Sequence, residues 1–171
     1  MGMATSVYKM ESLHAPWRIH YILARKPVPS DTSLFTRIAQ SSDDENNLVI
    51  ARDRTCFAVL NAYPYNGGHL MVVPYKPTDD LNALTDEELC DLMKLTRRCQ
   101  NALVNVMQPH GFNIGINLGK VAGAGIVDHL HIHIVPRWNG DTNFMPVIAE
   151  TAVLPEALSD LAAKLRAALA P

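Results

Sequence analysis

Two stretches of the chain alternate strictly between apolar and polar side chains. In residues 112–118 phenylalanine, isoleucine and leucine alternate with asparagine and glycine, and in residues 129–134 leucine and isoleucine alternate with three histidines. A period of two is typical of a β-strand that buries one face, because successive side chains point to opposite sides. The linker 119–125 is rich in glycine and can turn easily, so we expect the two strands to pair antiparallel with their apolar sides toward helices.

Three shorter apolar runs come earlier in the chain, at 48–51, 56–60 and 70–73. Polar or turn residues bound each run, which predicts three further strands. The break at 66–68, which reads Asn-Gly-Gly, predicts that the last two strands form a hairpin with a longer loop.

Apolar residues at helical spacing predict two helices. The first begins near Thr85, which forms a capping box with Glu88, and it ends at Pro109. The second covers residues 155–170 and has a proline in its first turn. Strands and helices in this order favour an α+β fold, and we expect an antiparallel sheet of about five strands with two main helices.

The length of the chain fits a single domain. It has 171 residues, of which 48% are hydrophobic and 19% charged, as in ordinary globular proteins. We divide the domain, 1–171, into an irregular N-terminal arm (1–45) with one short strand around 20–23, a core (48–138) and a C-terminal helix (155–170).

Composition excludes several classes of protein. The formal net charge of -2 argues against a nucleic-acid-binding surface. The sequence has neither a secretory signal nor a run of ~20 apolar residues that could span a membrane. Its three cysteines lack C-x-x-C spacing, which argues against a disulfide framework or a cysteine zinc site. We therefore expect a cytoplasmic protein with no nucleic-acid or membrane partner.

His129, His131 and His133 share one face of their predicted strand. Neighbouring rings would lie roughly 6.5 Å apart and the outer two about 13 Å apart. Two of them could share a zinc ion, but a third is hard to add from a straight strand. Three ordinary polar side chains are another interpretation, although such a cluster costs stability unless a function retains it.

Phosphate chemistry is the use that this row of histidines suits best. Imidazole is nucleophilic at neutral pH because its neutral form is well populated, and the flanking rings can donate to phosphate oxygens. Backbone amides of the loop at 123–125 can add further donors. These are the groups that phosphoryl or nucleotidyl transfer requires.

Residues 129–135 read HLHIHIV and resemble the motif of the histidine triad family, His-φ-His-φ-His-φ-φ with φ apolar. A second segment, 60–74, resembles the nucleoside-binding hairpin of that family. The resemblance covers residues 48–138. It implies a HIT-like fold and a homodimer in which two sheets become continuous.

The resemblance also implies a role for each site residue. It implies that His131 attacks the α-phosphorus of a nucleotide and forms a covalent nucleotidyl-histidine. His133 and His129 are expected to support the phosphate and the ring of the nucleophile. Outside the motif it implies a fourth histidine, His69, a ribose-binding Asn61, and Asn117 near the phosphates.

The chain departs from the family pattern in two places. Many relatives carry a C-x-x-C zinc element where this chain has Ser-Leu-Phe-Thr at 33–36, so we expect no metal site. Many hydrolase relatives carry a glutamine shortly before the triad, where this chain has Gly-Ile-Val-Asp at 125–128. We therefore expect phosphate contacts from the backbone amides of Ala124 and Gly125. No cofactor is expected, apart from Mg²⁺ that arrives with a polyphosphate substrate.

Residues 15–18 and 136–144 resemble bacterial family members described as diadenosine tetraphosphate phosphorylases or adenylyltransferases. This implies a two-step nucleotidyl transfer that cleaves a dinucleoside polyphosphate or similar adenine nucleotide at the α-phosphate, by phosphorolysis or hydrolysis. Two alternatives remain open: a nucleoside phosphoramidase of the same family, and a nucleotide-binding protein without catalysis.

Overall fold

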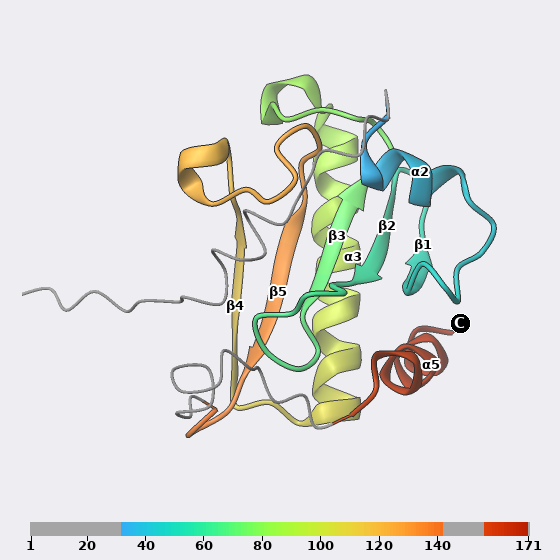
Figure 1. Ribbon diagram of the computed structural model, residues 1–171, viewed down its shortest axis with the longest axis vertical. Coiled ribbons are helices and arrows are strands. Elements are labelled where there is room, and N and C mark those ends of the chain that lie inside the picture. Colours follow the sequence, from blue (N-terminus) through green and yellow to red (C-terminus); the bar gives the residue numbers. More distant parts are fainter. Residues whose placement is uncertain (1–31, 142–155, 171) are drawn as a thin grey trace, which may run out of the picture.

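Five strands form one antiparallel sheet in the computed structural model, which describes residues 32–141 and 156–170. The strands are β1 (Val49–Arg52), β2 (Cys56–Leu60), β3 (Leu70–Pro74), β4 (Gly111–Ile116) and β5 (Ile132–Arg137). Their spatial order is β1-β2-β3-β5-β4, as Figure 1 shows. The predicted α+β class, the β2–β3 hairpin and the antiparallel β4–β5 pair are confirmed.

Two long helices, α3 (Asp86–Met107) and α5 (Leu158–Leu169), cover one face of this sheet (Figure 1). Their buried residues join the inward-facing side chains of the strands in one core: Ile50, Cys56, Ala58, Leu60, Leu70, Val72, Leu92, Leu95, Cys99, Ala102, Leu103, Ile132, Ile134, Leu161, Ala162 and Leu165. Two short 3₁₀ turns, η1 (Leu81–Ala83) and η2 (Lys120–Ala122), lie in the connections. Within the described ranges, no helix is both long enough and apolar enough to cross a bilayer.

The predicted capping box of α3 is present. The Thr85 hydroxyl accepts from the Glu88 N–H at 3.2 Å, and the Glu88 carboxylate accepts from the Thr85 N–H at 2.8 Å. At the other end the chain leaves the helix through Gln108 in the left-handed region, with φ 49°, just before Pro109. Helix α5 begins at Leu158, and the proline predicted to open it lies outside the described residues.

The predicted irregular arm, 1–45, is wrong at its C-terminal end, where residues Leu34–Gln40 form helix α2. The helix is short and Ser33 caps it without a side-chain hydrogen bond, so local sequence carries little signal for it. Tertiary packing supplies its stability instead. Phe35 and Ile38 pack on the sheet face opposite α3, against a second cluster that includes Phe57. The strand predicted at 20–23 lies outside the described residues.

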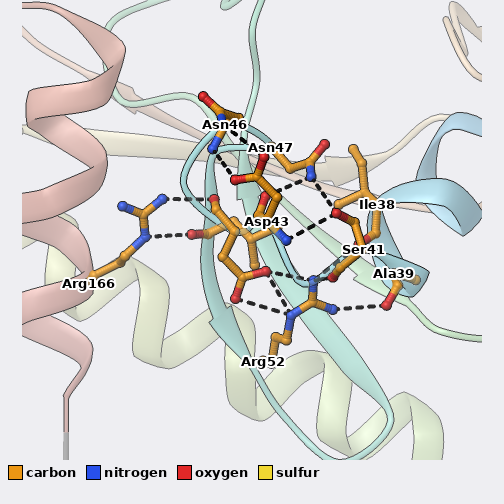
Figure 2. A network of polar contacts seen from close by, with 10 residues as sticks. Ile38, Ala39, Ser41, Asp43, Asn46, Asn47, Arg52 and Arg166 are labelled. Carbon is orange, nitrogen blue, oxygen red and sulfur yellow. Dashed lines mark hydrogen bonds and ion pairs between the residues drawn. The ribbon is translucent and has the colours of Figure 1, made fainter.

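The Arg52 side chain, from β1, caps the C-terminal end of α2, as Figure 2 shows. Its guanidinium donates to the carbonyls of Ile38, Ala39 and Ser41 at 2.8–3.1 Å, and to the Asp44 carboxylate at 2.7 Å. Carbonyls at a helix end have no partner within the helix, so this guanidinium satisfies groups that would otherwise need water.

Arg166 of α5 binds the other side of the same loop. It donates to the carbonyl oxygens of Val49 at 2.7 Å and Asp44 at 2.9 Å (Figure 2). Two arginines from distant parts of the sequence therefore hold the segment that joins α2 to β1.

The triad strand is shorter than its alternating pattern. Strand β5 begins at Ile132, so His129 and His131 precede it. The preceding segment pairs instead with the chain after β3: the Leu130 N–H donates to the Thr78 carbonyl at 2.7 Å. The straight three-histidine strand assumed for the spacing estimate is thus wrong, because pairing with β4 reaches only Ile132 and the main chain at Leu130 bonds to Thr78 instead.

Strand β4 lies at the edge of the sheet. Of its alternating apolar residues, Phe112 and Ile116 pack partly against the core, but Ile114 is 47% exposed. The expected apolar cover by the helices therefore does not extend over all of β4. In the linker that follows, Gly119 and Gly123 have φ of 80° and 88°, which only glycine adopts without strain.

Candidate active site

The histidines lie on the sheet face opposite α3 and α5. Ile132 and Ile134 point into the core and are 4% and 0% exposed, while His133 between them belongs to the other face. Register places His133 between Met71 of β3 and Gly115 of β4. The alternation of apolar and histidine positions therefore places the rings on the face where Phe35 and Phe57 pack.

The tautomer of His131 follows from its hydrogen bond. Its Nδ1 lies 2.9 Å from the carbonyl oxygen of His129. A carbonyl can only accept, so Nδ1 carries the proton and Nε2 of the neutral ring keeps its lone pair. Burial lowers the pKa of His131, and the hydrogen bond to the His129 carbonyl only partly opposes this effect. The ring is therefore held neutral, in the form in which Nε2 is a nucleophile.

Phe35 supplies much of the burial around His131. Its ring centroid lies 5.2 Å from that of His131 and 5.6 Å from that of His129, and it is itself 1% exposed. Sequence reasoning missed this contact because Phe35 is far away in the chain, in the segment assigned to an irregular arm. Only the position of α2 on the sheet reveals it.

His129 contacts His131 through its main chain. Its own Nε2 donates to the Pro74 carbonyl at 2.8 Å, and its buried Nδ1 has no partner among the described residues. Burial also lowers the pKa of His129. The neutral ring of His129 therefore links β3 to the segment before β5, and the main-chain carbonyl of His129 orients His131.

His69 lies beside the triad, fully buried, with Nε2 2.9 Å from Nδ1 of His133. Its Nδ1 lies 3.2 Å from the Asn61 amide nitrogen and 3.2 Å from the Tyr65 main-chain nitrogen. The structure thus brings His69 and Asn61 together with the triad. Tyr65 was not predicted, although its place four residues before His69 in the hairpin loop was a usable signal.

Five rings form a continuous row across the site. Successive centroid distances are 5.2 Å from Phe35 to His131, 4.7 Å from His131 to His133, 5.1 Å from His133 to His69 and 4.6 Å from His69 to Tyr65. The row is closed at Phe35 and open at Tyr65, which is 45% exposed. The His131–His133 separation is shorter than the strand spacing suggested, because the two rings tilt toward an edge-to-face contact.

The linker before the triad is held by hydrogen bonds within itself and to Asn117. The Asn117 amide donates to the Gly123 carbonyl at 3.4 Å, while the Ala124 N–H donates to the Gly119 carbonyl, also at 3.4 Å. Gly125 is exposed. At Gly115, directly across from His133, an added Cβ would meet no atom of the described residues within 4 Å. As far as residues 32–141 and 156–170 are concerned, there is therefore open space on the β4 side of the histidines.

The residues present do not fit the zinc element of the family. Ser33 and Thr36 offer hydroxyls where thiolates would be needed. Across 32–141 and 156–170, no group of three or more histidine, cysteine, aspartate or glutamate side chains is arranged to hold a metal ion.

A buried histidine whose Nε2 lone pair is available, on an antiparallel sheet beside further histidines, is an arrangement of the histidine triad type, and its chemistry allows Nε2 to act as a nucleophile. The HIT domain family model matches residues 43–140. The chain therefore belongs to the histidine triad (HIT) family.

Known relatives include proteins named for dinucleotide cleavage. The AP-4-A phosphorylase of Mycobacterium tuberculosis is 46% identical over 159 residues, which cover 89% of this chain and 80% of that protein. The asymmetrical bis(5'-nucleosyl)-tetraphosphatase of Schizosaccharomyces pombe is 37% identical over 93 residues, covering 54% of this chain and 50% of that protein. A Zn-bound histidine triad family protein of Mycobacterium smegmatis superposes with a TM-score of 0.65 at 29% identity, over 81% of this chain and 93% of that one.

Proposed function

We propose that this protein cleaves dinucleoside polyphosphates such as diadenosine tetraphosphate at the α-phosphate, through a nucleotidyl-histidine on His131. The observation that carries the proposal is the protonation of His131, whose Nδ1 donates to the His129 carbonyl at 2.9 Å and so leaves the Nε2 lone pair for attack. The identity to the M. tuberculosis phosphorylase supports the choice of substrate.

The reaction has two displacements. In the first, Nε2 of His131 bonds to the α-phosphorus while the bond from that phosphorus to the polyphosphate oxygen breaks, releasing ATP from diadenosine tetraphosphate. In the second, an oxygen of inorganic phosphate attacks the same phosphorus, the P–N bond breaks and ADP leaves. If water were the second nucleophile, the product would be AMP. We propose phosphate, because the relative with 46% identity is named a phosphorylase.

We assign the substrate contacts as follows. His133 and the main-chain amides of Ala124 and Gly125 bind phosphate oxygens, with Asn117 beside them, and Asn61 lies on the ribose side. The Ala124 N–H already donates within its loop at 3.4 Å, so its use requires a small movement of the linker. The protein holds no resident cofactor in this proposal, and Mg²⁺ enters with the polyphosphate.

We also propose a homodimer in which two β4 edges pair into a continuous sheet. Within the described residues β4 pairs only with β5, which leaves a row of main-chain groups open at the edge, and Ile114 is 47% exposed there. A cytoplasmic location is part of the same proposal, and the three free thiols support it.

Product analysis tests the activity. With diadenosine tetraphosphate and inorganic phosphate we expect ADP plus ATP, and without phosphate we expect an adenylylated His131 in the intact-mass and peptide spectra. The His131→Ala variant should form neither, since no other group supplies the nucleophile.

Three results would contradict the proposal. AMP plus ATP in the presence of phosphate would replace phosphorolysis by hydrolysis. Turnover of adenosine 5'-phosphoramidate without cleavage of the dinucleotide would favour the phosphoramidase. Nucleotide binding that is equal in parent and His131→Ala, with no turnover by either, would favour a binding protein.

A further inference from the structure

Both ends of the Asn61 side-chain amide are engaged. Its oxygen accepts from the Tyr63 main-chain N–H at 2.9 Å, and its nitrogen lies 3.2 Å from Nδ1 of His69. The main-chain N–H can only donate, so the oxygen must face Tyr63 and the NH₂ group must face His69. The orientation of the amide is therefore settled by the backbone.

Two donors consequently point at one nitrogen of His69. The Asn61 NH₂ and the main-chain N–H of Tyr65 each lie 3.2 Å from Nδ1, so this nitrogen is an acceptor and carries no proton. The proton of a neutral His69 is then on Nε2, which donates to Nδ1 of His133 at 2.9 Å. In turn, the neutral His133 must carry its proton on Nε2.

We propose that Asn61 is a positioning residue that, together with the Tyr65 main chain, sets the tautomers of His69 and His133 so that His133 presents an Nε2–H donor beside His131. The inference rests on the proposed function for its catalytic consequence, namely a donor for phosphate or leaving-group oxygens. The role is additional to the ribose contact that the family resemblance implies, because Asn61 uses one amide N–H and one oxygen lone pair within the hairpin loop and keeps one of each.

The tautomers can be measured directly without any substrate. Long-range ¹H–¹⁵N correlation of histidine-labelled protein, above neutral pH where imidazole is uncharged, distinguishes protonated from unprotonated ring nitrogens. We expect protons on Nε2 of both His69 and His133, and on Nδ1 of His131. A proton on Nδ1 of His69 in the parent protein would overturn the proposal, and this measurement needs no variant.

Two substitutions of Asn61 separate positioning from ribose binding. Asn61→Asp keeps the size of the side chain but replaces the donor with an acceptor, which favours a proton on Nδ1 of His69. Asn61→Ala removes one donor and leaves that of Tyr65. Positioning therefore predicts that kcat falls by about tenfold or more in Asn61→Asp and by less in Asn61→Ala, as expected for a histidine held in the wrong tautomer.

A ribose contact without positioning predicts the opposite order. A carboxylate accepts from ribose hydroxyls, so Asn61→Asp would keep kcat while Asn61→Ala would raise KM. That order, or unchanged ¹⁵N signals of His69 in Asn61→Asp, would overturn the proposal. Asn101→Asp, on the exposed side of α3, is the control for one added negative charge and should match the parent in both readouts.

Failure of this inference and failure of the proposed function are distinguishable. If the parent protein does not cleave dinucleoside polyphosphates, the ¹⁵N pattern still tests the tautomers. If the parent is active but His69 carries its proton on Nδ1, the activity stands and only the role of Asn61 is lost.

Discussion

At the scale of single residues, the tautomers of His131, His129 and His69 are each assigned by a main-chain neighbour whose hydrogen-bonding role is unambiguous. A main-chain carbonyl determines which nitrogen of His131 and of His129 is protonated, and a main-chain N–H determines it for His69. The tautomer of His133 then follows from its contact with His69. Burial then keeps His131 and His129 neutral by lowering their pKa values. In the proposed reaction, His131 would thus have the protonation state of a nucleophile before a substrate binds.

The pH dependence of activity should respond to Phe35. Burial lowers the pKa of His131, so the neutral nucleophile persists to lower pH than an exposed histidine would. Phe35→Ala admits water, the pKa rises toward the ordinary value of about 6.5, and the acidic limb of kcat/KM moves to higher pH. A pH–rate profile measures this shift.

The matched control is Phe57→Leu, which loosens the same apolar cluster 6.5 Å from Phe35. It should cost stability but leave the acidic limb in place. An acidic limb of kcat/KM that is unchanged in Phe35→Ala, or that shifts equally in both variants, would contradict the role of Phe35 in burying His131.

At the scale of elements, helix α2 covers the histidine face although its own sequence is too short to be stable alone. Its C-terminal carbonyls are satisfied by Arg52, and the following loop is bound by Arg166. These contacts keep Phe35 over His131. The position of the helix thus depends on strand β1 and helix α5.

Arg52→Ala should lower the free energy of unfolding by about 2 kcal/mol, because several charge-assisted hydrogen bonds are lost together. Urea unfolding measures the change. Arg97→Ala, on the exposed side of α3, is the control, and it should stay within about 0.5 kcal/mol of the parent. Equal stability of the two variants would show that Arg52 does not hold α2.

At the scale of the whole molecule, the two faces of the sheet differ in what they carry. Helices α3 and α5 close one face over the main core, while the histidines occupy the other face between α2 and the open β4 side. The sheet edge at β4 is the surface where a second copy would extend the structure.

Ile114→Glu should convert the proposed dimer to a monomer, since a charge at the centre of β4 opposes edge pairing. Light scattering coupled to size exclusion measures the mass, which we expect to be twice the chain mass for the parent. Met93→Glu, at another exposed apolar position, on α3, should keep the mass of the parent. A monomeric parent, or a dimeric Ile114→Glu, would refute the arrangement.

Local sequence determined much of this protein. The capping box at Thr85 and the alternation around the triad act between near neighbours, so they predicted the start of α3 and the face of His133. The resemblance of HLHIHIV added the family. Element bounds shifted where neighbours intervened, as in residues 129–131, which pair with the chain after β3.

Tertiary structure alone decided what surrounds His131. Helix α2 has no strong local signal, because its stability comes from Arg52 and from packing on β1 and β2. The tautomers likewise depend on atoms brought together by the fold, such as the Pro74 carbonyl and the Tyr65 N–H. The sequence alone determined the row of three histidines and the family, while long-range contacts decided which ring nitrogens are protonated, because the hydrogen-bond partners of these rings come from distant segments of the chain.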